Sequence, residues 1–189
     1  MIARSVSFVA TERTVIEYIT LDDAPFFVSL LNSPDWLRYI GDRQINTVED
    51  ASRYLQGGFV RSYADYGYGY YLVKALPDRV PVGICGFLNK PELDNPDFGF
   101  ALVAEYYGQG YALESCRAVL DRGIQAFGFA VLDAVTKVAN LRSIRLLEKL
   151  GFERLGVAAA NVTGDDLLLY RWHRAAGREG AEKTVIHPD

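Results

Sequence analysis

The segment from Asp97 to Gly128 constrains the fold of this chain more than any other part of its sequence. It opens with DFGFALVAE, in which small or polar residues alternate with Phe98, Phe100 and Leu102, so we expect a strand with one crowded face and one open face. The loop YYGQG follows. The next stretch, YALESCRAVLDRGIQAFG, has apolar residues at helical spacing and predicts a helix of about four turns. A strand therefore passes through a glycine-containing turn directly into a helix.

This strand, turn and helix together favour the binding of an anion. The first turn of a helix has backbone N–H groups without intrahelical partners, and it carries the positive end of the helix dipole. Gly108 and Gly110 place no side chain in the way of a phosphate, and Ala112 keeps the first helical turn slim. The pattern indicates a nucleotide or coenzyme site. For the loop taken alone, a tight turn without a ligand remains the alternative.

Two familiar phosphate-binding motifs do not fit this loop. A dinucleotide-binding motif needs a third glycine where this sequence has Leu113, and it needs an acidic residue at the end of a following strand, which is missing here. A P-loop needs a lysine and a hydroxyl residue after its second glycine, where this sequence has Tyr111 and Ala112.

The rest of the chain predicts further strands and helices around a mixed sheet. Strands are expected over residues 11–20, 68–75, 82–88, 97–105, 130–139, 152–157 and 166–172, and helices over residues 20–34, 46–67, 111–128 and 141–150. Thr20 and Asp23 form a capping pair for the first helix, while Asn140 and Gly151 mark the start and the stop of the last one. We expect one α/β domain over residues 1–174 and a mobile tail over residues 175–189.

Composition excludes several classes of protein. Hydrophobic residues make up 50% of the chain, which suits a globular core, but no apolar stretch approaches the ~20 residues of a membrane span and no signal sequence is recognisable. We therefore expect a cytoplasmic protein without membrane contact. A net charge of −4 argues against binding to a nucleic-acid backbone. His173 and His187 are too few for a usual metal site, and Cys85 and Cys116 are expected as reduced core thiols.

Two segments resemble the motifs of a known superfamily. DFGFALVAEYYGQGYALES is similar to the acetyl-CoA-binding motif of the GNAT acetyltransferases, and NLRSIRLLEKLGF is similar to the second motif of that superfamily. TERTVIEYITLDDAPFFVSLL and DWLRYIGDR also resemble the branch that contains the ribosomal-protein N-terminal acetyltransferases RimJ and RimL. The resemblance covers roughly residues 11–172. It implies the GNAT fold, an α/β (α+β) architecture with a mixed, mostly antiparallel central sheet, splayed strands and flanking helices.

The resemblance also implies a set of contacts with acetyl-CoA. The loop pattern of the superfamily has Gln or Arg, two residues, Gly, one residue, and Gly or Ala; Tyr107, Gly110 and Ala112 occupy these positions here. The aromatic residue departs from the general pattern and matches the branch. The loop contacts implied in this way are Tyr107, Gly108, Gln109, Gly110, Tyr111 and Ala112. Main-chain groups of Leu102 and Val103 would pair with the pantetheine arm. Asn140 would bond the pantetheine region, unless it serves only as a helix cap.

Acetyl transfer to an amine needs a base for the amine proton, donors for the carbonyl oxygen and an acid for the departing thiolate. Many family members use a tyrosine seven residues after the asparagine as the acid, but this chain has Leu147 there. Ser143 lies one helical turn after Asn140 and resembles the serine of this branch, so it is the candidate acid. Asp97 is the candidate base, acting through a water molecule, at a strand start where relatives often carry a glutamate. A helix-face serine and a solvated carboxylate remain the structural alternatives.

The acceptor is the least specified part of the prediction. Trp36, Tyr39 and Arg43 are the candidate acceptor contacts, because loops between the first two helices set specificity in this fold. The resemblance implies acetyl-CoA as cosubstrate, no metal, and a protein N-terminal amine as acceptor. A small-molecule amine is an open alternative, and Leu147 keeps a non-catalytic acyl-CoA-binding protein open as another. A monomer and a homodimer are both compatible with an exposed strand edge near the C-terminus.

Overall fold

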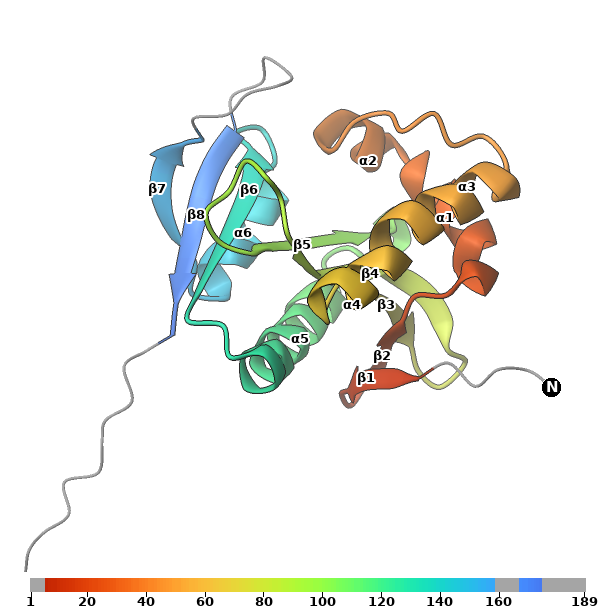
Figure 1. Ribbon diagram of the computed structural model, residues 1–189, viewed down its shortest axis with the longest axis horizontal. Coiled ribbons are helices and arrows are strands. Elements are labelled where there is room, and N and C mark those ends of the chain that lie inside the picture. The colour runs from red at the N-terminus through yellow and green to blue at the C-terminus, as the bar shows by residue number, and fades with distance from the viewer. Residues whose placement is uncertain (1–5, 159–166, 175–189) are drawn as a thin grey trace, which may run out of the picture.

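A computed structural model describes residues 6–158 and 167–174 of the chain. Within these residues, eight strands form one sheet in the order β1-β2-β3-β4-β5-β6-β8-β7 (Figure 1). The strands are β1 (Ser7–Ala10), β2 (Thr14–Tyr18), β3 (Tyr70–Ala75), β4 (Val80–Leu88), β5 (Asp97–Leu102), β6 (Val131–Lys137), β7 (Glu153–Val157) and β8 (Leu167–His173). The helices are α1 (Ala24–Leu31), α2 (Pro34–Tyr39), α3 (Val48–Leu55), α4 (Arg61–Tyr66), α5 (Tyr111–Phe127) and α6 (Leu141–Lys149). This arrangement confirms the predicted fold class.

Helices cover both faces of the sheet because the strands are apolar on both sides. In β3, Tyr71 and Val73 belong to a core cluster that includes residues of α5, whereas the intervening Leu72 belongs to a second cluster with α1 and α3. Figure 1 shows α1, α2 and α3 gathered on one side of the molecule and α5 with α6 on the other. The site described below lies where these two groups of helices meet the middle of the sheet.

The middle of the sheet opens between β5 and β6. These two strands are parallel and share the single register pair Asp97 with Asp133, whereas the other neighbouring strands run antiparallel. Asp133 holds the closed end, because its N–H donates to the Pro96 carbonyl at 2.9 Å and its carboxylate accepts from the Asn95 Nδ2 at 3.1 Å. Arg171 of β8 donates to the same carboxylate through Nε at 2.7 Å and Nη2 at 3.0 Å. Beyond that pair the strands diverge, which confirms the expected splay.

The capping signals of the sequence mark real helix starts. Thr20 and Asp23 form a capping box at a short helical turn, Leu21–Asp23, which leads into α1, and Thr47 caps α3 by accepting a hydrogen bond from the Asp50 N–H at 3.1 Å. The helix predicted over residues 46–67 is divided into α3, a wider turn at Gln56–Val60 and α4. Sequence reasoning missed β1 and α2, each of which has six residues or fewer.

Other expectations meet the structure in part. Cys85 and Cys116 are both buried, unpaired thiols, as predicted. Burial raises the pKa of Cys116, and the neighbouring Cys85, which β4 brings close to α5, raises it further. None of the helices in the described ranges is long and apolar enough to cross a membrane. No cluster of His, Cys, Asp and Glu suited to a metal ion occurs among the residues that the structure describes. The predicted tail over residues 175–189 lies outside the described residues.

Candidate functional site

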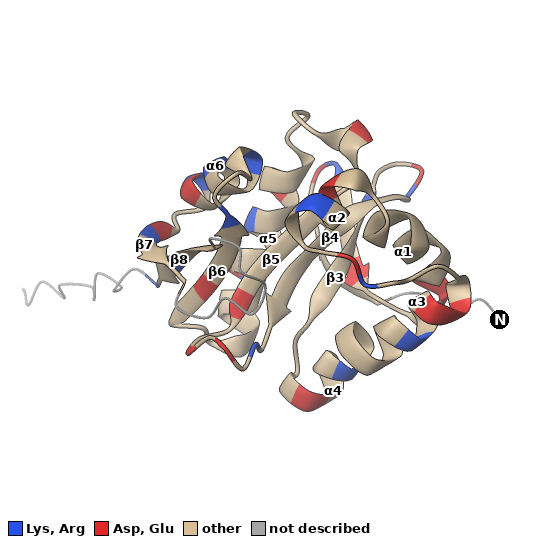
Figure 2. Ribbon diagram, turned by 90° about the horizontal axis from the view of Figure 1, so that it is seen from above, with Lys and Arg blue, Asp and Glu red and all other residues tan. Residues whose placement is uncertain are grey.

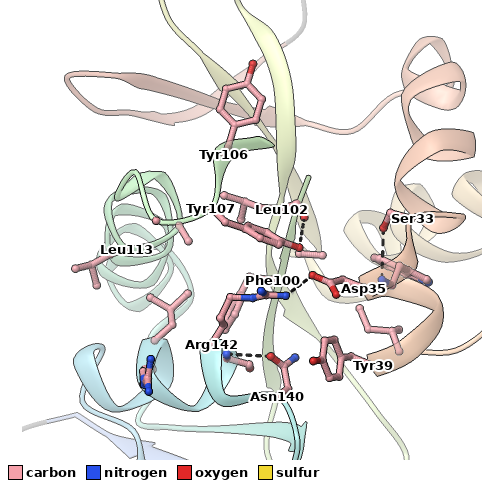
Figure 3. A pocket seen from close by; sticks show the side chains of 18 of the residues that line it. Ser33, Asp35, Tyr39, Phe100, Leu102, Tyr106, Tyr107, Leu113, Asn140 and Arg142 are labelled. Carbon is pink, nitrogen blue, oxygen red and sulfur yellow. Dashed lines mark hydrogen bonds and ion pairs between the residues drawn. The ribbon is translucent and has the colours of Figure 1, made fainter. Parts of the chain in front are cut away.

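A cavity of about 410 Å³ lies beside the splayed end of β5. Four parts of the chain line it: α1 with α2, the second half of β5, the loop leading into α5, and α6 (Figure 3). Phe100, Ala101 and Leu102 form its floor, while Trp36 and Tyr39 face them from α2. A long, mostly apolar cleft of this size suits a ligand with a flexible apolar arm and a polar head.

The predicted glycine loop borders this cavity and has the conformation that its glycines permit. Gly108 has a φ angle of +72° and Gly110 a φ angle of +87°, which non-glycine residues rarely adopt. Gly110 is the N-cap of α5, and its carbonyl accepts the first intrahelical bond, from the Glu114 N–H at 3.1 Å. The N–H groups of residues 111–113, between Gly110 and Glu114, have no intrahelical partner. They lie at the positive end of a helix of 17 residues, which suits a phosphate group.

The backbone polar groups of β5 are directed alternately to the cavity and to the neighbouring strand β4. The Val103 N–H donates to the Val82 carbonyl of β4 at 2.9 Å, and Val103 does not line the cavity. The Leu102 carbonyl instead accepts a hydrogen bond from the Tyr107 hydroxyl at 3.0 Å, inside the cleft. Successive residues of a strand direct their polar groups to opposite sides. Of the two residues predicted to pair with a pantetheine arm, Leu102 therefore directs its backbone to the cleft, while the Val103 N–H is used within the sheet.

Three polar side chains from different elements meet across the cavity. Asp35 of α2 forms an ion pair with Arg142 of α6, and the Arg142 guanidinium carbon lies 4.4 Å from the ring centroid of Tyr107 (Figure 3). Burial and the nearby Asp35 carboxylate raise the pKa of Tyr107 to about 12, so its hydroxyl remains a neutral donor at physiological pH. This cluster joins the wall formed by α2 to the glycine loop and α6.

Asn140 and Ser143 lie together at the start of α6. The Asn140 side-chain oxygen accepts a hydrogen bond from the Ser143 N–H at 3.2 Å, so Asn140 is a helix cap, and its side-chain NH₂ remains available as a donor. Both residues line the cavity. Leu147, by contrast, is 1% exposed and belongs to the core beneath the sheet. The structure therefore brings Ser143, but not the residue at position 147, to the cleft.

The other predicted site residues are divided between the cavity and its surroundings. Tyr107, Gly108, Gly110, Ala112, Trp36 and Tyr39 line it, whereas Gln109, Tyr111, Arg43 and Asp97 do not. Asp97 is 2% exposed and forms an ion pair with Lys90 at 2.7 Å. Burial raises the pKa of Asp97, while the Lys90 ammonium opposes this shift. Its predicted role as a base therefore requires a relay to the cleft.

Sequence reasoning missed several residues that line the cavity. Asp35 contributes the one carboxylate among the lining residues that the structure describes, and Arg142, Arg145 and Lys149 contribute positive charge from α6. The three basic residues are spaced at three and then four positions, so they share one face of the helix (Figure 2 shows Lys and Arg on α6 in blue). Because this spacing follows Asn140 directly, it could have predicted a basic helix face at the site. Asp35 had no comparable signal, because it lies on the helix that was not predicted.

Comparison with known proteins finds a family that matches most of the chain. Residues 13–153 match the family described as an acetyltransferase (GNAT) domain. The chain is 26% identical over 148 residues to the uncharacterized N-acetyltransferase YoaA of Bacillus subtilis (strain 168), covering 78% of this chain and 83% of that protein.

Two solved structures share the fold. One is the ribosomal L7/L12 alpha-N-protein acetyltransferase RimL in complex with coenzyme A, with a TM-score of 0.75, 19% identity, and coverage of 89% of this chain and 98% of that one. The other is an acetyltransferase from Salmonella typhimurium described as modifying the N-terminal serine of L7/L12, with a TM-score of 0.75, 15% identity, and coverage of 89% and 99%.

Proposed function

The chain belongs to the GNAT acetyltransferase family, and from this premise we propose that it transfers an acetyl group from acetyl-CoA to the N-terminal amine of a protein in the cytoplasm. Proteins of similar fold are described as ribosomal-protein N-terminal acetyltransferases, which favours an acceptor of this kind. The observation that carries the proposal is the composition of the cavity. It combines a glycine loop at a helix N-terminus with an aromatic acceptor wall, formed by Trp36, Tyr39 and Phe100. Among the described lining residues, Asp35 is the one carboxylate, and it is already paired with Arg142.

The residues present fit coenzyme A. Gly108 and Gly110 have positive φ angles beside the unpartnered amides of α5, which suits the pyrophosphate. The backbone of Leu102 and the side-chain NH₂ of Asn140 offer polar contacts for the amide groups of the pantetheine arm. Arg145 and Lys149 continue the positive side of the cleft along α6, which suits the remaining phosphate.

The charge of the cavity favours a peptide N-terminus over a polyamine or an amino sugar. Polycationic acceptors need several carboxylates, but Asp35 is the one acidic residue in the described lining and Arg142 already neutralises it. Trp36, Tyr39 and Phe100 instead offer flat apolar surfaces. An N-terminal amine carries one charge on an otherwise neutral backbone, so it matches this wall better.

The reaction forms a bond between the amine nitrogen and the acetyl carbon and breaks the bond between that carbon and the sulfur. The amine loses a proton and the departing thiolate gains one. Asp35 lies in the cleft and can accept the proton directly or through water, whereas Asp97 would have to act through a relay because it is buried. Ser143 lines the cavity near Asn140 and is the hydroxyl that we assign to the thiolate. Positioning of the two reactants supplies much of the rate enhancement for an activated thioester.

The test is an acetyl-transfer assay with matched acceptors. The purified protein and acetyl-CoA are incubated with short peptides that have a free N-terminus, with the same peptides carrying a blocked N-terminus and an internal lysine, and with spermidine and an amino sugar. Free thiol is measured, and the acetylated atom is located by mass spectrometry. We expect acetylation of the free N-termini alone.

Two alternatives have distinct outcomes in that assay. Acetylation of spermidine or the amino sugar without any peptide product would replace the proposed acceptor with a small amine. Binding of coenzyme A without transfer to any acceptor would favour a non-catalytic acyl-CoA-binding protein, the alternative suggested by Leu147. Neither result would change the family assignment.

A further inference from the structure

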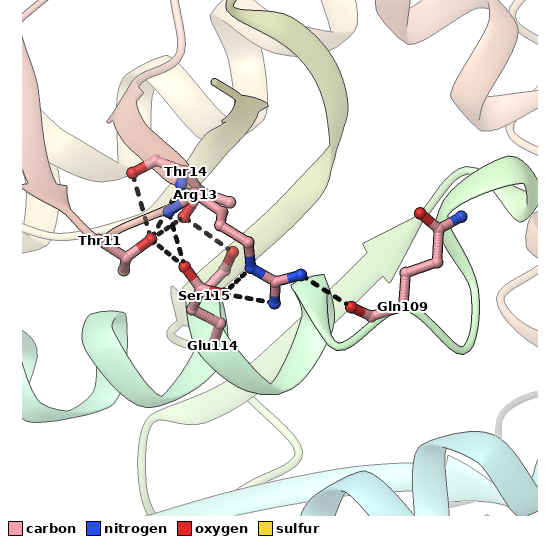
Figure 4. A network of polar contacts seen from close by, with 6 residues as sticks. All are labelled: Thr11, Arg13, Thr14, Gln109, Glu114 and Ser115. Atoms are coloured by element: carbon pink, nitrogen blue, oxygen red, sulfur yellow. Dashed lines mark hydrogen bonds and ion pairs between the residues drawn. The ribbon is translucent and has the colours of Figure 1, made fainter. Parts of the chain in front are cut away.

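The turn between β1 and β2 reaches the glycine loop from the far end of the sequence. The Arg13 Nη1 donates to the Gln109 carbonyl at 3.0 Å, a contact across 96 residues of sequence. The same guanidinium lies 4.7 Å from the ring centroid of Tyr111, and its Nε donates to the Glu114 carboxylate at 2.7 Å (Figure 4). One side chain therefore contacts the loop, the first residue of α5 and the first turn of that helix.

The bond to Gln109 determines the orientation of the next amide. A trans peptide unit is planar, and its C=O and N–H groups point in opposite directions. When Arg13 holds the Gln109 carbonyl, the Gly110 N–H is directed away from Arg13, and Gly110 lines the cavity. A Cβ atom at Gly110 would lie 3.1 Å from Arg13 Nη2, so a side chain at this position would crowd the contact.

Arg13 also compensates the negative charge of Glu114. Glu114 lies in the first turn of α5, where a bound phosphate would meet its negative charge. Burial raises the pKa of Glu114, but hydrogen bonds from Thr11 and Arg13 outweigh this effect and hold the pKa below its usual value. The carboxylate is therefore ionised at neutral pH. Arg13 neutralises it next to the anion seat.

The turn is itself firmly docked on α5. The Thr11 hydroxyl donates to Glu114 at 2.6 Å and lies 2.7 Å from the Thr14 hydroxyl, and the Ser115 hydroxyl bonds to Thr14 at 3.3 Å. Thr14 and Ser115 are 0% and 1% exposed. Arg13 thus projects from a fixed base and needs little further ordering to hold the loop.

We propose that Arg13 is a positioning residue for the cofactor loop: it orients the Gln109–Gly110 peptide and cancels the charge of Glu114, so that the loop accepts the pyrophosphate of coenzyme A. The inference rests on the proposed use of acetyl-CoA. It assigns a role in cofactor affinity to the N-terminal hairpin, none of whose described residues lines the cavity.

The experiment measures the dissociation constant of coenzyme A by calorimetry for the wild type and for Arg13→Ala, Arg13→Lys, Glu114→Gln and the double variant Arg13→Ala with Glu114→Gln. Arg53→Ala is the matched control, since Arg53 also forms an ion pair with a partly buried carboxylate, on α3 and away from the loop. Thermal unfolding of each variant shows that it is folded at the temperature of measurement. Steady-state kinetics with an active acceptor separate KM for acetyl-CoA from kcat.

We expect Arg13→Ala to weaken binding of coenzyme A at least about tenfold and to raise KM for acetyl-CoA by a similar factor, with kcat changed less than about twofold. The double variant recovers part of the loss because the repulsive carboxylate is gone, and Arg13→Lys recovers part because the charge is kept. Arg53→Ala binds as the wild type does.

Folded Arg13→Ala that binds coenzyme A with the affinity of the wild type overturns this inference and leaves the proposed function intact. Loss of binding in the double variant as severe as in Arg13→Ala overturns the charge argument. A folded wild type that does not bind coenzyme A overturns both this inference and the proposed cosubstrate.

Discussion

Gly110→Ala should separate backbone strain from cofactor binding, because the same strain can be introduced at the other end of the same helix. Gly110 begins α5 with a φ angle of +87°, and Gly128 ends it with a φ angle of +72°. Placing alanine in the left-handed region costs about 1–2 kcal/mol, and the stiffer unfolded chain returns about 0.4–1 kcal/mol. We expect a net loss of about 1 kcal/mol, or about 2–4 °C in Tm, for each variant.

The two variants should differ in their affinity for coenzyme A. Gly128 has open space around its added Cβ and lies far from the cavity lining, whereas Gly110 lies within the lining and its Cβ would crowd Arg13. If the backbone relaxes to relieve the strain of an alanine at position 110, the neighbouring amides turn away from the pyrophosphate. Loss of one hydrogen bond from such an amide to a charged group costs about 1.5–3 kcal/mol. Calorimetry should show at least about tenfold weaker binding for Gly110→Ala and unchanged binding for Gly128→Ala. Equal affinity in both variants would show that the loop is not the pyrophosphate seat.

Three further predictions concern the closed end of the splay and the basic face of α6. Arg171→Leu leaves the Asp133 carboxylate, which is 1% exposed, without its cation, so chemical denaturation should show a loss of about 3 kcal/mol or more. Burial raises the pKa of Asp97, so its contribution to stability is present below its ordinary pKa and is lost as the pH rises through the raised value. The free energy of unfolding of the wild type relative to that of Asp97→Asn should therefore fall in this pH window, and parallel pH profiles of the two proteins would contradict the shift. Arg145→Gln should weaken binding of coenzyme A several-fold but leave binding of 3′-dephospho-coenzyme A nearly unchanged, and an equal loss for both ligands would place the contact elsewhere.

The conformation of the glycine loop and the cap of α6 could be predicted from sequence because their determinants are local. Gly108, Gly110 and Asn140 act through the backbone angle or the helix cap at their own positions, and both properties follow from residue type. The alternation in β5 likewise predicted a strand with room on one side. Val103, by contrast, was predicted as a main-chain contact of the cofactor, but its N–H bonds to β4. The register between β4 and β5 decides which N–H groups are used within the sheet, and residue type does not reveal that register.

The wall formed by α2 could be predicted only in part. Trp36 and Tyr39 were predicted at the site and line the cavity, but the helix that carries them together with Asp35 has only six residues and no apolar repeat long enough to reveal it. Arg13 offered even less signal, since its role depends on a contact with a loop 96 residues away. Asp97 was predicted as a base acting through water, with a solvated carboxylate as the alternative, but its position at the one pair between β5 and β6 buries it.

Leu147 is the residue that argues most strongly against acetyl transfer, because many family members have the tyrosine acid at this position. Its surroundings nevertheless leave room for the proposed reaction with another donor. The side chain is packed into the core with Leu150 and Phe152, so a larger polar residue at this position would need a different arrangement beneath the sheet. Ser143 lies one turn earlier and lines the cavity, where its hydroxyl can meet a sulfur held over β5. The leaving thiolate also needs only a modest donor, since a free thiol has a pKa of about 8.5 and its anion is therefore a good leaving group. Ser143→Ala is therefore expected to lower kcat without changing the affinity for coenzyme A, which distinguishes a donor to the thiolate from a serine that only lies on the face of α6.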